Sequence, residues 1–408
     1  MILDNDSASM LSHGLAAESV APAWPPLTLA EIKHLLVRYP QVGEIKRLVW
    51  FSPRPFSSAC VVDTASGRLF VKRLIKAIRS CADLVEEHRF IAHLASHIPP
   101  GGPAVSEVLS DITGATAIAD GDWTYEVHRL GQGKDIYRDA FSWTPFEEAT
   151  HAYAAGRALA QFHQGAAGYD APPRKATLLV SGFSIASNDD PLAAMQDYID
   201  ARPGLADYVA QRNWRQDAQR VLMPFHQRLQ PFLKKLVPLW THNDWHASNL
   251  LWQAPDGPYL QHGRANDEAA QVATILDFGL CDKTCAVYDL AIAIVTNTIE
   301  WLRLPEHAAP DGISGAQLVH FDQLDALLDG YETVTPLSAF DVAAVAAMLP
   351  LAHVEFALSE LAYFYGVQNS AENAAVAYDT YLLGHAEWFN SAAGIHLLAH
   401  IQGRVITS

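Results

Sequence analysis

The sequence has few cysteines for its length. Its 408 residues include four, at positions 60, 81, 281 and 285, which is too few for a disulfide scaffold. Cys281 and Cys285 are four residues apart, but the sequence offers no second cysteine pair or spaced histidines to complete a zinc site. We therefore expect reduced thiols and a cytoplasmic protein.

The sequence also lacks an export signal and a convincing membrane span. Two aspartates lie among the first six residues, where a signal peptide is basic or apolar. The most hydrophobic segment, residues 342–367, contains Pro350, Glu355 and Glu360, and burying these groups in a bilayer would be costly. We expect neither export nor a membrane partner, and we interpret the segment as core helices.

Acidic residues outnumber basic residues in the sequence. The chain has 28 Lys and Arg against 45 Asp and Glu, and its formal net charge is −17. A nucleic acid requires a basic face, so we do not expect one as partner. The negative charge suits a cationic partner, although many acidic proteins are acidic only for solubility. Half of the residues are hydrophobic and 18% are charged, which predicts a globular chain of two or three lobes.

A dense polar cluster lies between apolar segments in the second half of the chain. Apolar residues flank it at 239–240 and 250–252, and the polar side chains between them are His242, Asp244, His246 and Asn249. A further apolar run, residues 272–276, ends at Asp277. Phosphoryl transfer needs a carboxylate to deprotonate a hydroxyl, and an amide oxygen and a second carboxylate to hold Mg²⁺. Asp244, Asn249 and Asp277 fit these roles in chain order.

The pattern His-x-Asp-x-x-x-x-Asn, followed by an apolar run ending in Asp-Phe-Gly, resembles the aminoglycoside phosphotransferase and choline kinase family. The resemblance implies a two-lobed, protein-kinase-like α+β fold, with a small antiparallel β lobe and a larger helical lobe. It implies ATP and Mg²⁺ as cofactors. It implies that Asp244 and His242 take part in catalysis and that Asn249 and Asp277 bind the metal. It also implies that Asp289 supports the catalytic loop by accepting hydrogen bonds from the loop's backbone. Asn243 and Leu280 depart from the usual pattern, at positions that supply no ligand atom in the family.

The N-terminal part predicts the small lobe. We expect a loose Ser/Ala/Pro-rich arm at 1–26, the small lobe at 27–130 and the large lobe at 131–408. Thr28 and Glu31 form a capping box that begins a helix. Strands are expected at 46–51, 59–63, 69–74, 105–108, 115–118 and 124–127.

Lys72 lies in the third predicted strand. The resemblance implies that its ammonium binds the nucleotide phosphates, whereas the alternative is an edge-strand lysine in solvent. Alternation along the strand then turns Arg73 to solvent. The predicted helix 82–95 brings Glu87 toward Lys72 as its ion-pair partner, with Glu86 as the competing candidate.

Two further segments are candidates for nucleotide contacts. The loop 52–58 contains no glycine, and Ser57 and Ser58 either present backbone N–H groups to phosphate or form a plain hairpin turn. In the family, the segment after the last strand of the small lobe pairs with adenine through its backbone. That resemblance points to Glu126, Val127 and His128.

The large lobe is predicted to be mainly helical. A capping box at Thr144 and Glu147 begins a helix that ends near His163, which we interpret as structural. Residues 253–271 read as an expanded hairpin tip. Other helices are expected at 191–199, 214–236, 321–331, 341–349, 353–364 and 373–388.

Carboxylates within the apolar C-terminal helices are candidates for binding the acceptor. Such groups require a cation or a donor, and the candidate set is His246, Glu300, Glu355 and Glu360. The alternative is that these glutamates face solvent or pair with arginines such as Arg303.

The leading interpretation is ATP-dependent phosphorylation of a hydroxyl on a small molecule, either an aminoglycoside, an amino alcohol or a homoserine-like acceptor. Two alternatives are a nucleotide-binding regulatory protein without turnover and a protein Ser/Thr kinase. The presence of Lys72, Asp244, Asn249 and Asp277 disfavours the first. The missing glycine-rich loop and the long helical C-terminal part disfavour the second.

Overall fold

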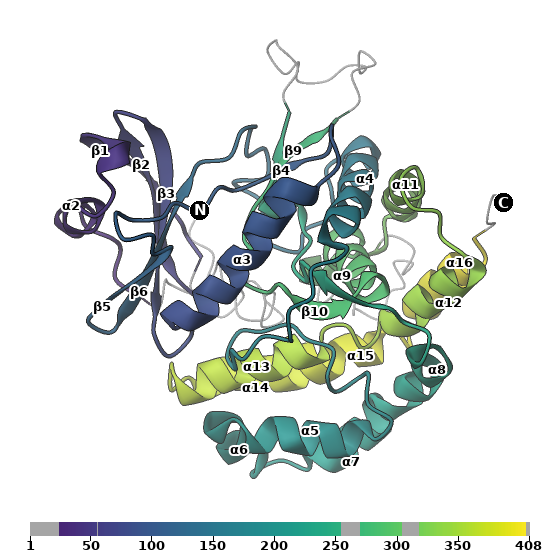
Figure 1. Ribbon diagram of the computed structural model, residues 1–408. Helices are drawn as coiled ribbons and strands as arrows, with labels where there is room; N and C mark the ends of the chain where they lie inside the picture. Colours follow the sequence, from purple (N-terminus) through teal and green to yellow (C-terminus); the bar gives the residue numbers. More distant parts are fainter. Residues whose placement is uncertain (1–23, 55, 254–269, 304–317, 405–408) are drawn as a thin grey trace.

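The computed structural model describes residues 24–54, 56–253, 270–303 and 318–404. The predictions for most of the N-terminal arm and for the hairpin tip lie outside these residues. A five-stranded antiparallel sheet forms the small lobe, in the order β1-β2-β3-β6-β5 (Figure 1). Its strands are β1 (Ile45–Phe51), β2 (Ser58–Thr64), β3 (Gly67–Ile75), β5 (Ala117–Asp120) and β6 (Trp123–Arg129).

One face of this sheet is covered by helix α2 (Leu29–Leu36) and a short 3₁₀ turn, Pro40–Val42. The predicted capping box is confirmed, since the Thr28 hydroxyl accepts from Glu31 N–H and the Glu31 carboxylate accepts from Thr28 N–H. Arg73 lies under this cover, only 5% exposed, and ion-pairs with Glu31 at 2.7 Å. The prediction that Arg73 faces solvent is therefore wrong, because the face opposite Lys72 is also packed.

Helix α3 (Cys81–His97) covers the other face and lies between the sheet and the large lobe, where it packs on α4 (Ala149–Ala166) (Figure 1). Ser80 caps its first turn with Asp83. The predicted capping box at Thr144 and Glu147 is wrong: α4 begins after Glu148, and the Thr144 hydroxyl donates to the carbonyl of Phe141 instead.

Short strands form the centre of the molecule. β7 (Pro238–Thr241) pairs antiparallel with β10 (Asp282–Cys285), and β9 (Val272–Ile275) lies between β4 (Ala104–Val105) and β8 (Leu250–Trp252). A 3₁₀ turn, Ala247–Asn249, precedes β8, and α9 (Ala286–Thr298) follows β10 directly. The end of β7 therefore lies next to the first turn of α9, and the residue after β9, Leu276, is joined to the loop after β7 through His242.

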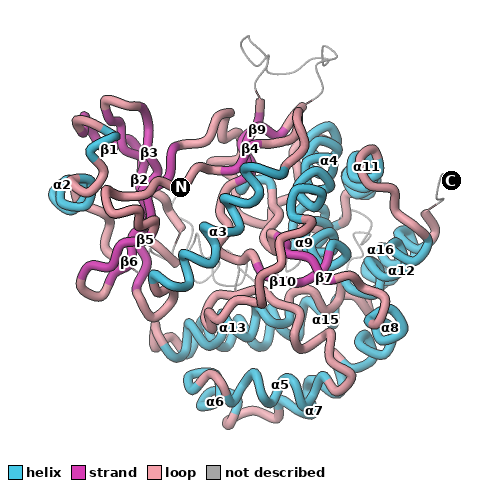
Figure 2. The backbone as a smooth tube through the Cα atoms, in the orientation of Figure 1, coloured by secondary structure: helices cyan, strands magenta, loops and turns pink. Residues whose placement is uncertain are grey.

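The rest of the large lobe is helical (Figure 2). Predicted helix 214–236 is divided in two, and predicted helix 373–388 contains a π-helical segment, Val376–Gly384. A 3₁₀ turn spans Trp301–Arg303, and the remaining helices are α5 (Pro191–Asp200), α6 (Pro203–Val209), α7 (Trp214–Val221), α8 (Met223–Leu233), α11 (Phe321–Glu332), α12 (Ala339–Met348), α13 (Val354–Gly366), α14 (Ala371–Ala375), α15 (His385–Trp388) and α16 (Ala392–Gln402). Within the described residues, no helix has both the length and the apolar character that a membrane crossing needs.

Helices α4 and α11 cross in backbone contact. A Cβ atom on Gly156 would overlap the carbonyl of Leu327, and a Cβ atom on Gly330 would overlap the carbonyl of Tyr153. The same two helices are also joined by side chains, since the ring of His163 on α4 bonds the hydroxyl of Tyr331 on α11 at 2.9 Å. The two glycines are therefore required by the close approach of the helices, and His163 is structural, as predicted.

Candidate active site

The loop between β7 and β8 is held by its backbone. Asp289, in the first turn of α9, accepts hydrogen bonds from the N–H groups of His242 at 2.9 Å and Asn243 at 2.8 Å. The Nε2 atom of His163 lies 3.1 Å from the same carboxylate. Burial acts to raise the pKa of Asp289, but the two histidines and the loop N–H bonds outweigh it and lower that pKa. Asp289 is thus an ionised anchor beneath the loop, with the backbone contacts that the resemblance implied.

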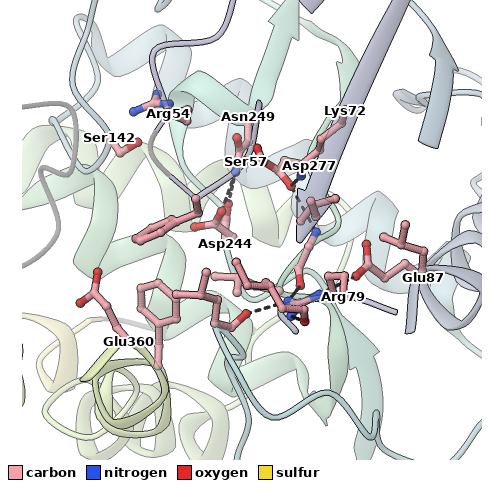
Figure 3. A pocket seen from close by; sticks show the side chains of 18 of the residues that line it. Arg54, Ser57, Lys72, Arg79, Glu87, Ser142, Asp244, Asn249, Asp277 and Glu360 are labelled. Atoms are coloured by element: carbon pink, nitrogen blue, oxygen red, sulfur yellow. Dashed lines mark hydrogen bonds and ion pairs between the residues drawn. The ribbon is translucent and has the colours of Figure 1, made fainter. Parts of the chain in front are cut away.

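Asp244 and Asn249 lie side by side on this loop (Figure 3). The amide nitrogen of Asn249 donates to the Asp244 carbonyl and to its carboxylate, both at 2.9 Å. Because both hydrogen bonds use the nitrogen, the amide oxygen remains for a metal ion. His246 stands beside them, its Nε2 atom 3.5 Å from Asp244 Oδ1 and its Nδ1 atom 2.9 Å from Ser248 Oγ.

Lys72 and Asp277 face each other across the two lobes. The ammonium of Lys72 is 3.1 Å from Asp277 Oδ1 and 4.0 Å from Glu126 Oε1. Burial acts to lower the pKa of Lys72, but the two carboxylates raise it, so the ammonium stays protonated. Burial likewise acts to raise the pKa of Asp277, but Lys72 lowers it. The pair therefore presents one fixed cation and one fixed anion to the space between the lobes.

These side chains open into one pocket, a cavity of about 160 Å³. Of the predicted site residues, its lining includes Ser57, Lys72, Glu87, Glu126, Asp244, His246, Asn249, Asp277 and Glu360. It also includes residues that the sequence did not indicate, notably Arg54, Arg79, Ser142, Trp143 and Phe356. The pocket thus joins the predicted metal ligands and the nucleotide lysine to an aromatic and acidic end near α13.

Backbone strain concentrates around the pocket. Among the described residues, five non-glycine residues have positive φ angles. Four of them line the pocket or belong to the catalytic loop, namely Trp143, Leu179, Asn243 and Asp277. Such conformations cost roughly 1–3 kcal/mol each and persist where the surroundings impose them, often at functional sites. The distribution makes this pocket the candidate functional centre.

Comparison with known proteins agrees with this geometry. The model of the phosphotransferase enzyme family matches residues 56–327, more than half of the chain. The chain belongs to this family. The phosphotransferase has a fold similar to that of a microcompartment-associated aminopropanol kinase, with a TM-score of 0.54 at 16% identity, over 90% of this chain and 99% of that one. The predicted two-lobed, kinase-like α+β fold is confirmed.

Two other solved structures also match the phosphotransferase. The aminoglycoside phosphotransferase from Alicyclobacillus acidocaldarius gives a TM-score of 0.48 at 16% identity, over 93% of this chain and 96% of that chain. A spectinomycin phosphotransferase, solved with ADP and spectinomycin, gives 0.49 at 11% identity, over 92% and 98%. No curated protein sequence matches significantly.

Two predicted contacts of the phosphotransferase lie outside the pocket lining. His242 is fully buried, packs on Phe278 and bonds the carbonyl of Leu276 at 2.9 Å through Nε2. It therefore connects the catalytic loop to the segment before Asp277, and the expectation that it takes part in catalysis directly is wrong. Ser58 turns away from the pocket, where its hydroxyl donates to the carbonyl of Pro25 at 2.8 Å.

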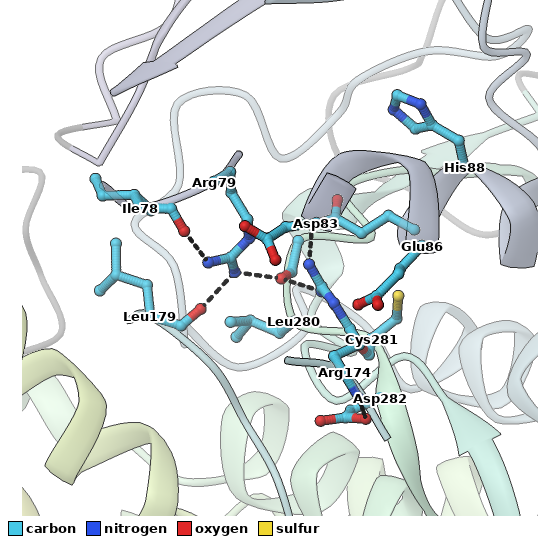
Figure 4. A network of polar contacts seen from close by, with 12 residues as sticks. Ile78, Arg79, Asp83, Glu86, His88, Arg174, Leu179, Leu280, Cys281 and Asp282 are labelled. Atoms are coloured by element: carbon cyan, nitrogen blue, oxygen red, sulfur yellow. Dashed lines mark hydrogen bonds and ion pairs between the residues drawn. The ribbon is translucent and has the colours of Figure 1, made fainter. Parts of the chain in front are cut away.

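Glu87 accepts hydrogen bonds from the buried side chains of two arginines, Arg79 and Arg174, which are labelled in Figure 4. Its Oε1 atom accepts from Arg79 Nε at 3.1 Å and from the guanidinium of Arg174. The other nitrogens of Arg79 donate to carbonyls that include Leu179 and Gly279, both at 2.7 Å. The prediction that Glu87 pairs with Lys72 is wrong, because the Glu87 carboxylate forms ion pairs with Arg79 and Arg174 instead. The network instead ties α3 to the segment after Asp277.

Residues 126–128 lie inside strand β6. All three residues pair with β3, and on the other side Glu126 pairs with β5. Beyond β5, the Val127 carbonyl accepts from Leu109 N–H at 2.8 Å and His128 forms a bridge with Val108. The prediction that this backbone pairs with adenine is wrong, because the strand ladder already uses it. The Glu126 side chain does reach the pocket, and its carboxylate bonds the rings of His88 at 2.9 Å and His128 at 3.0 Å.

The acceptor candidates separate into two groups. Glu300 bonds the ring of His320 at 2.9 Å, and Glu355 accepts from Ile185 N–H at 2.6 Å, both outside the pocket lining. The protein therefore supplies partners for both glutamates, and the pocket gives no support to these two acceptor predictions. Glu360 lines the pocket, is fully buried and finds no hydrogen-bond partner for either oxygen among the described residues. Burial raises the pKa of Glu360 well above its usual value.

Glu355 should make the stability of the phosphotransferase depend on pH. Burial raises the pKa of Glu355 to about 7 from 4.5, although the Ile185 and Ser184 bonds act to lower it. The folded state therefore holds this proton more tightly than the unfolded state, so the stabilisation is complete below pH 4.5 and is lost as pH rises through about 7.

Relative to Glu355→Gln, the wild-type free energy of unfolding should fall by on the order of 3 kcal/mol across this window. Urea unfolding between pH 5 and 8 measures it, with the exposed Glu372→Gln as matched control. Parallel pH profiles for wild type and Glu355→Gln would contradict the assignment.

Proposed function

We propose that this phosphotransferase transfers the γ-phosphoryl group of ATP to a hydroxyl of a small, amine-bearing molecule. The observation that carries the proposal is the convergence of Lys72, Asp244, Asn249 and Asp277 in one pocket between the lobes. We place the lobe boundary at residues 130/131, directly after β6, and the site of action in the cytoplasm, where ATP is supplied.

The donor set at the pocket fits Mg²⁺ and a nucleotide. Asn249 offers an amide oxygen and Asp277 a carboxylate, which are the hard oxygen ligands that Mg²⁺ prefers. A bound Mg²⁺ would offset the charge of the phosphates. Lys72, held as a cation by Asp277 and Glu126, is then the protein group that faces the phosphates.

Asp244 is the group that acts on the acceptor. Its carboxylate lies in the pocket, and Asn249 fixes it through two hydrogen bonds. From this position it orients the acceptor hydroxyl toward the phosphoryl group and accepts its proton as the new bond forms. The strained loop and its Asp289 anchor keep the carboxylate in place while charge shifts.

Arg54 compensates for the missing glycines of the loop over the pocket. Its guanidinium extends from the β1–β2 loop to Ser248 Oγ at 3.0 Å, so it spans the lobes beside Asp244 (Figure 3). Burial lowers the pKa of Arg54, while Asp244 and Asp277 act to raise it. A cation at this position meets the charge of the transferred phosphoryl group.

Replacing Arg54 by methionine should lower kcat/KM by about 10–100-fold, the value of one charge-assisted hydrogen bond. Arg54→Lys should recover part of the loss, because the charge returns without the planar fork. Steady-state kinetics measures both, with Arg89→Met, an exposed arginine outside the pocket lining, as control. If Arg54→Met kept wild-type kcat/KM, the phosphate role would be excluded.

Glu360 marks the end of the pocket that receives the amine. A buried carboxyl without a partner is costly, and an ammonium or amine donor on the acceptor would satisfy it. Trp143 and Phe356 line the same end and can shield such a group from water. The net charge of −17 adds a general attraction for cations.

Glu360→Gln should raise KM for an amine-bearing acceptor by about 10–100-fold, with little change in kcat, because the contact is made equally in ground and transition states. Glu355→Gln serves as control. Unchanged KM in Glu360→Gln would remove the cationic acceptor from the proposal.

The function itself is tested by acceptor-dependent ADP release. The compounds to screen are amino alcohols, homoserine-like amino acids, aminoglycosides and macrolides, with the first included because one protein of similar fold is an aminopropanol kinase. ADP release that rises with one compound supports the proposal. Tight ATP binding without acceptor-dependent release would favour the regulatory alternative, and release driven only by a protein substrate would favour a protein kinase.

A further inference from the structure

Three buried metal-binding side chains meet behind Lys72. His88 comes from α3, whereas Glu126 and His128 come from β6, and one ligand atom from each lies within 4.8 Å of the others. The Nε2 atoms of both rings point to the same oxygen, Glu126 Oε2, at 2.9 Å and 3.0 Å. Neither histidine lines the pocket of the proposed transfer reaction. The cluster therefore needs a separate explanation.

The surroundings favour ring nitrogens that act as ligands. Thr116 Oγ1 lies 2.9 Å from His88 Nδ1 and can accept the proton of that nitrogen. Without an ion, His88 Nε2 donates its proton to Glu126 Oε2. When an ion displaces that proton, Thr116 can hold the other tautomer, with the proton on Nδ1 and a lone pair on Nε2. A metal-bound histidine almost always donates its other ring N–H to an acceptor, which fixes the tautomer and the orientation of the ring.

The spacing also suits a small ion. Ligand atoms about 2.0–2.1 Å from a tetrahedral ion lie about 3.3 Å apart, so the two nitrogen–oxygen distances need to open by only a few tenths of an ångström. Two imidazoles and one carboxylate bind Zn²⁺ in known sites and leave a fourth position for water. Mg²⁺ prefers oxygen ligands, which separates this cluster from Asn249 and Asp277.

We propose that His88, Glu126 and His128 bind a divalent transition-metal ion of the Zn²⁺ type. The ion would take up Glu126 Oε2, while Oε1 of the same carboxylate lies 4.0 Å from Lys72. It would thereby reduce the negative charge that Lys72 meets on this side and leave Asp277 as its closer carboxylate. The site thus connects a transition metal to the lysine that faces the nucleotide, and this second part rests on the proposed function.

Zn²⁺ alone is the first probe, with the full-length protein stripped of metal and titrated against a chromophoric chelator in excess Mg²⁺. Wild type should bind one equivalent that His88→Gln and His128→Gln each weaken by at least about 10–100-fold. His97→Gln, an exposed position on the same helix, should bind as wild type does. Equal Zn²⁺ affinity in wild type and in both cluster variants would overturn the proposal.

Two measurements guard against variants that fail to fold. Thr116→Val keeps all three ligand side chains and removes only the hydroxyl that lies 2.9 Å from His88 Nδ1. It should weaken Zn²⁺ binding by about 10–100-fold, because the tautomer of His88 is no longer held. Co²⁺ bound to wild type should give the strong visible absorption of a four-coordinate ion. A weak octahedral spectrum, or unchanged Zn²⁺ affinity in folded Thr116→Val, would leave the cluster as a hydrogen-bonded support for Glu126 and would overturn the proposal.

The coupling is measured separately as the affinity for ATP and Mg²⁺ with and without one equivalent of Zn²⁺. A change in affinity that disappears in His128→Gln supports the connection to Lys72. Metal binding with no change in ATP affinity would refute the coupling while keeping the site. Absence of any ATP binding would instead count against the proposed function.

Discussion

Asp244→Asn is expected to lower kcat by about 10²–10⁴-fold while the affinity for ATP and Mg²⁺ stays within a few-fold. Asparagine keeps the shape of the side chain and an oxygen for the hydrogen bond from Asn249, which in wild type is 2.9 Å long. It cannot accept the proton of the acceptor hydroxyl. The substitution therefore separates proton transfer from nucleotide binding.

Steady-state kinetics with the identified acceptor gives kcat, and isothermal titration gives the nucleotide affinity. Asp170→Asn is a matched control, because Asp170 is 92% exposed and pairs with Lys283 at the surface. Its kcat should equal that of wild type. If Asp244→Asn also kept a kcat near wild type, Asp244 would lose its assigned role.

Asp277→Ala should weaken both nucleotide binding and catalysis. It removes a carboxylate expected to hold Mg²⁺. A bound Mg²⁺ stabilises the charge of the transition state by several kcal/mol, so we expect a loss of about 10³-fold in kcat/KM. The substitution also removes the partner 3.1 Å from Lys72, which leaves that ammonium with Glu126 alone. The affinity for Mg²⁺ should fall with the rate.

A Mg²⁺ titration at fixed ATP measures this effect and compares it directly with Asp244→Asn. The concentration of Mg²⁺ at half-maximal rate should rise in Asp277→Ala and stay constant in Asp244→Asn. The same Mg²⁺ dependence in both variants would show that the division between a proton acceptor and a metal ligand is incorrect.

The sequence predicted most reliably what is local. Asp244, Asn249 and Asp277 lie within one short region of the sequence, and the strands on either side fix their geometry. The motif alone therefore placed them in one pocket. Helical periodicity located α3 and α13 to within a few residues. The capping box at Thr28 was correct because its partners are three residues apart.

Apart from the capping box at Thr144 and Glu147, the errors concern partners that are distant in the sequence. Periodicity turned Glu87 inward, but its partner Arg174 is 87 residues away, in a segment with no regular pattern. Glu355 and Glu360 look alike in an apolar helix, yet only Glu360 opens into the pocket. Arg54 lies in a proline-rich loop where no spacing rule applies, and its role depends on Ser248 of the other lobe.

The crossing of α4 and α11 has a consequence for how this enzyme can diversify. Gly156 and Gly330 let α4 and α11 approach closely, which fixes the position of α4. His163 on α4 contacts Asp289, and Asp289 in turn holds the catalytic loop. The lining of the pocket includes no residue of this helix pair, which nevertheless fixes the position of the proposed catalytic loop. The acidic end of the pocket rests on α13, a separate helix, so under the proposed function substitutions there can change the acceptor while the transfer residues stay unchanged.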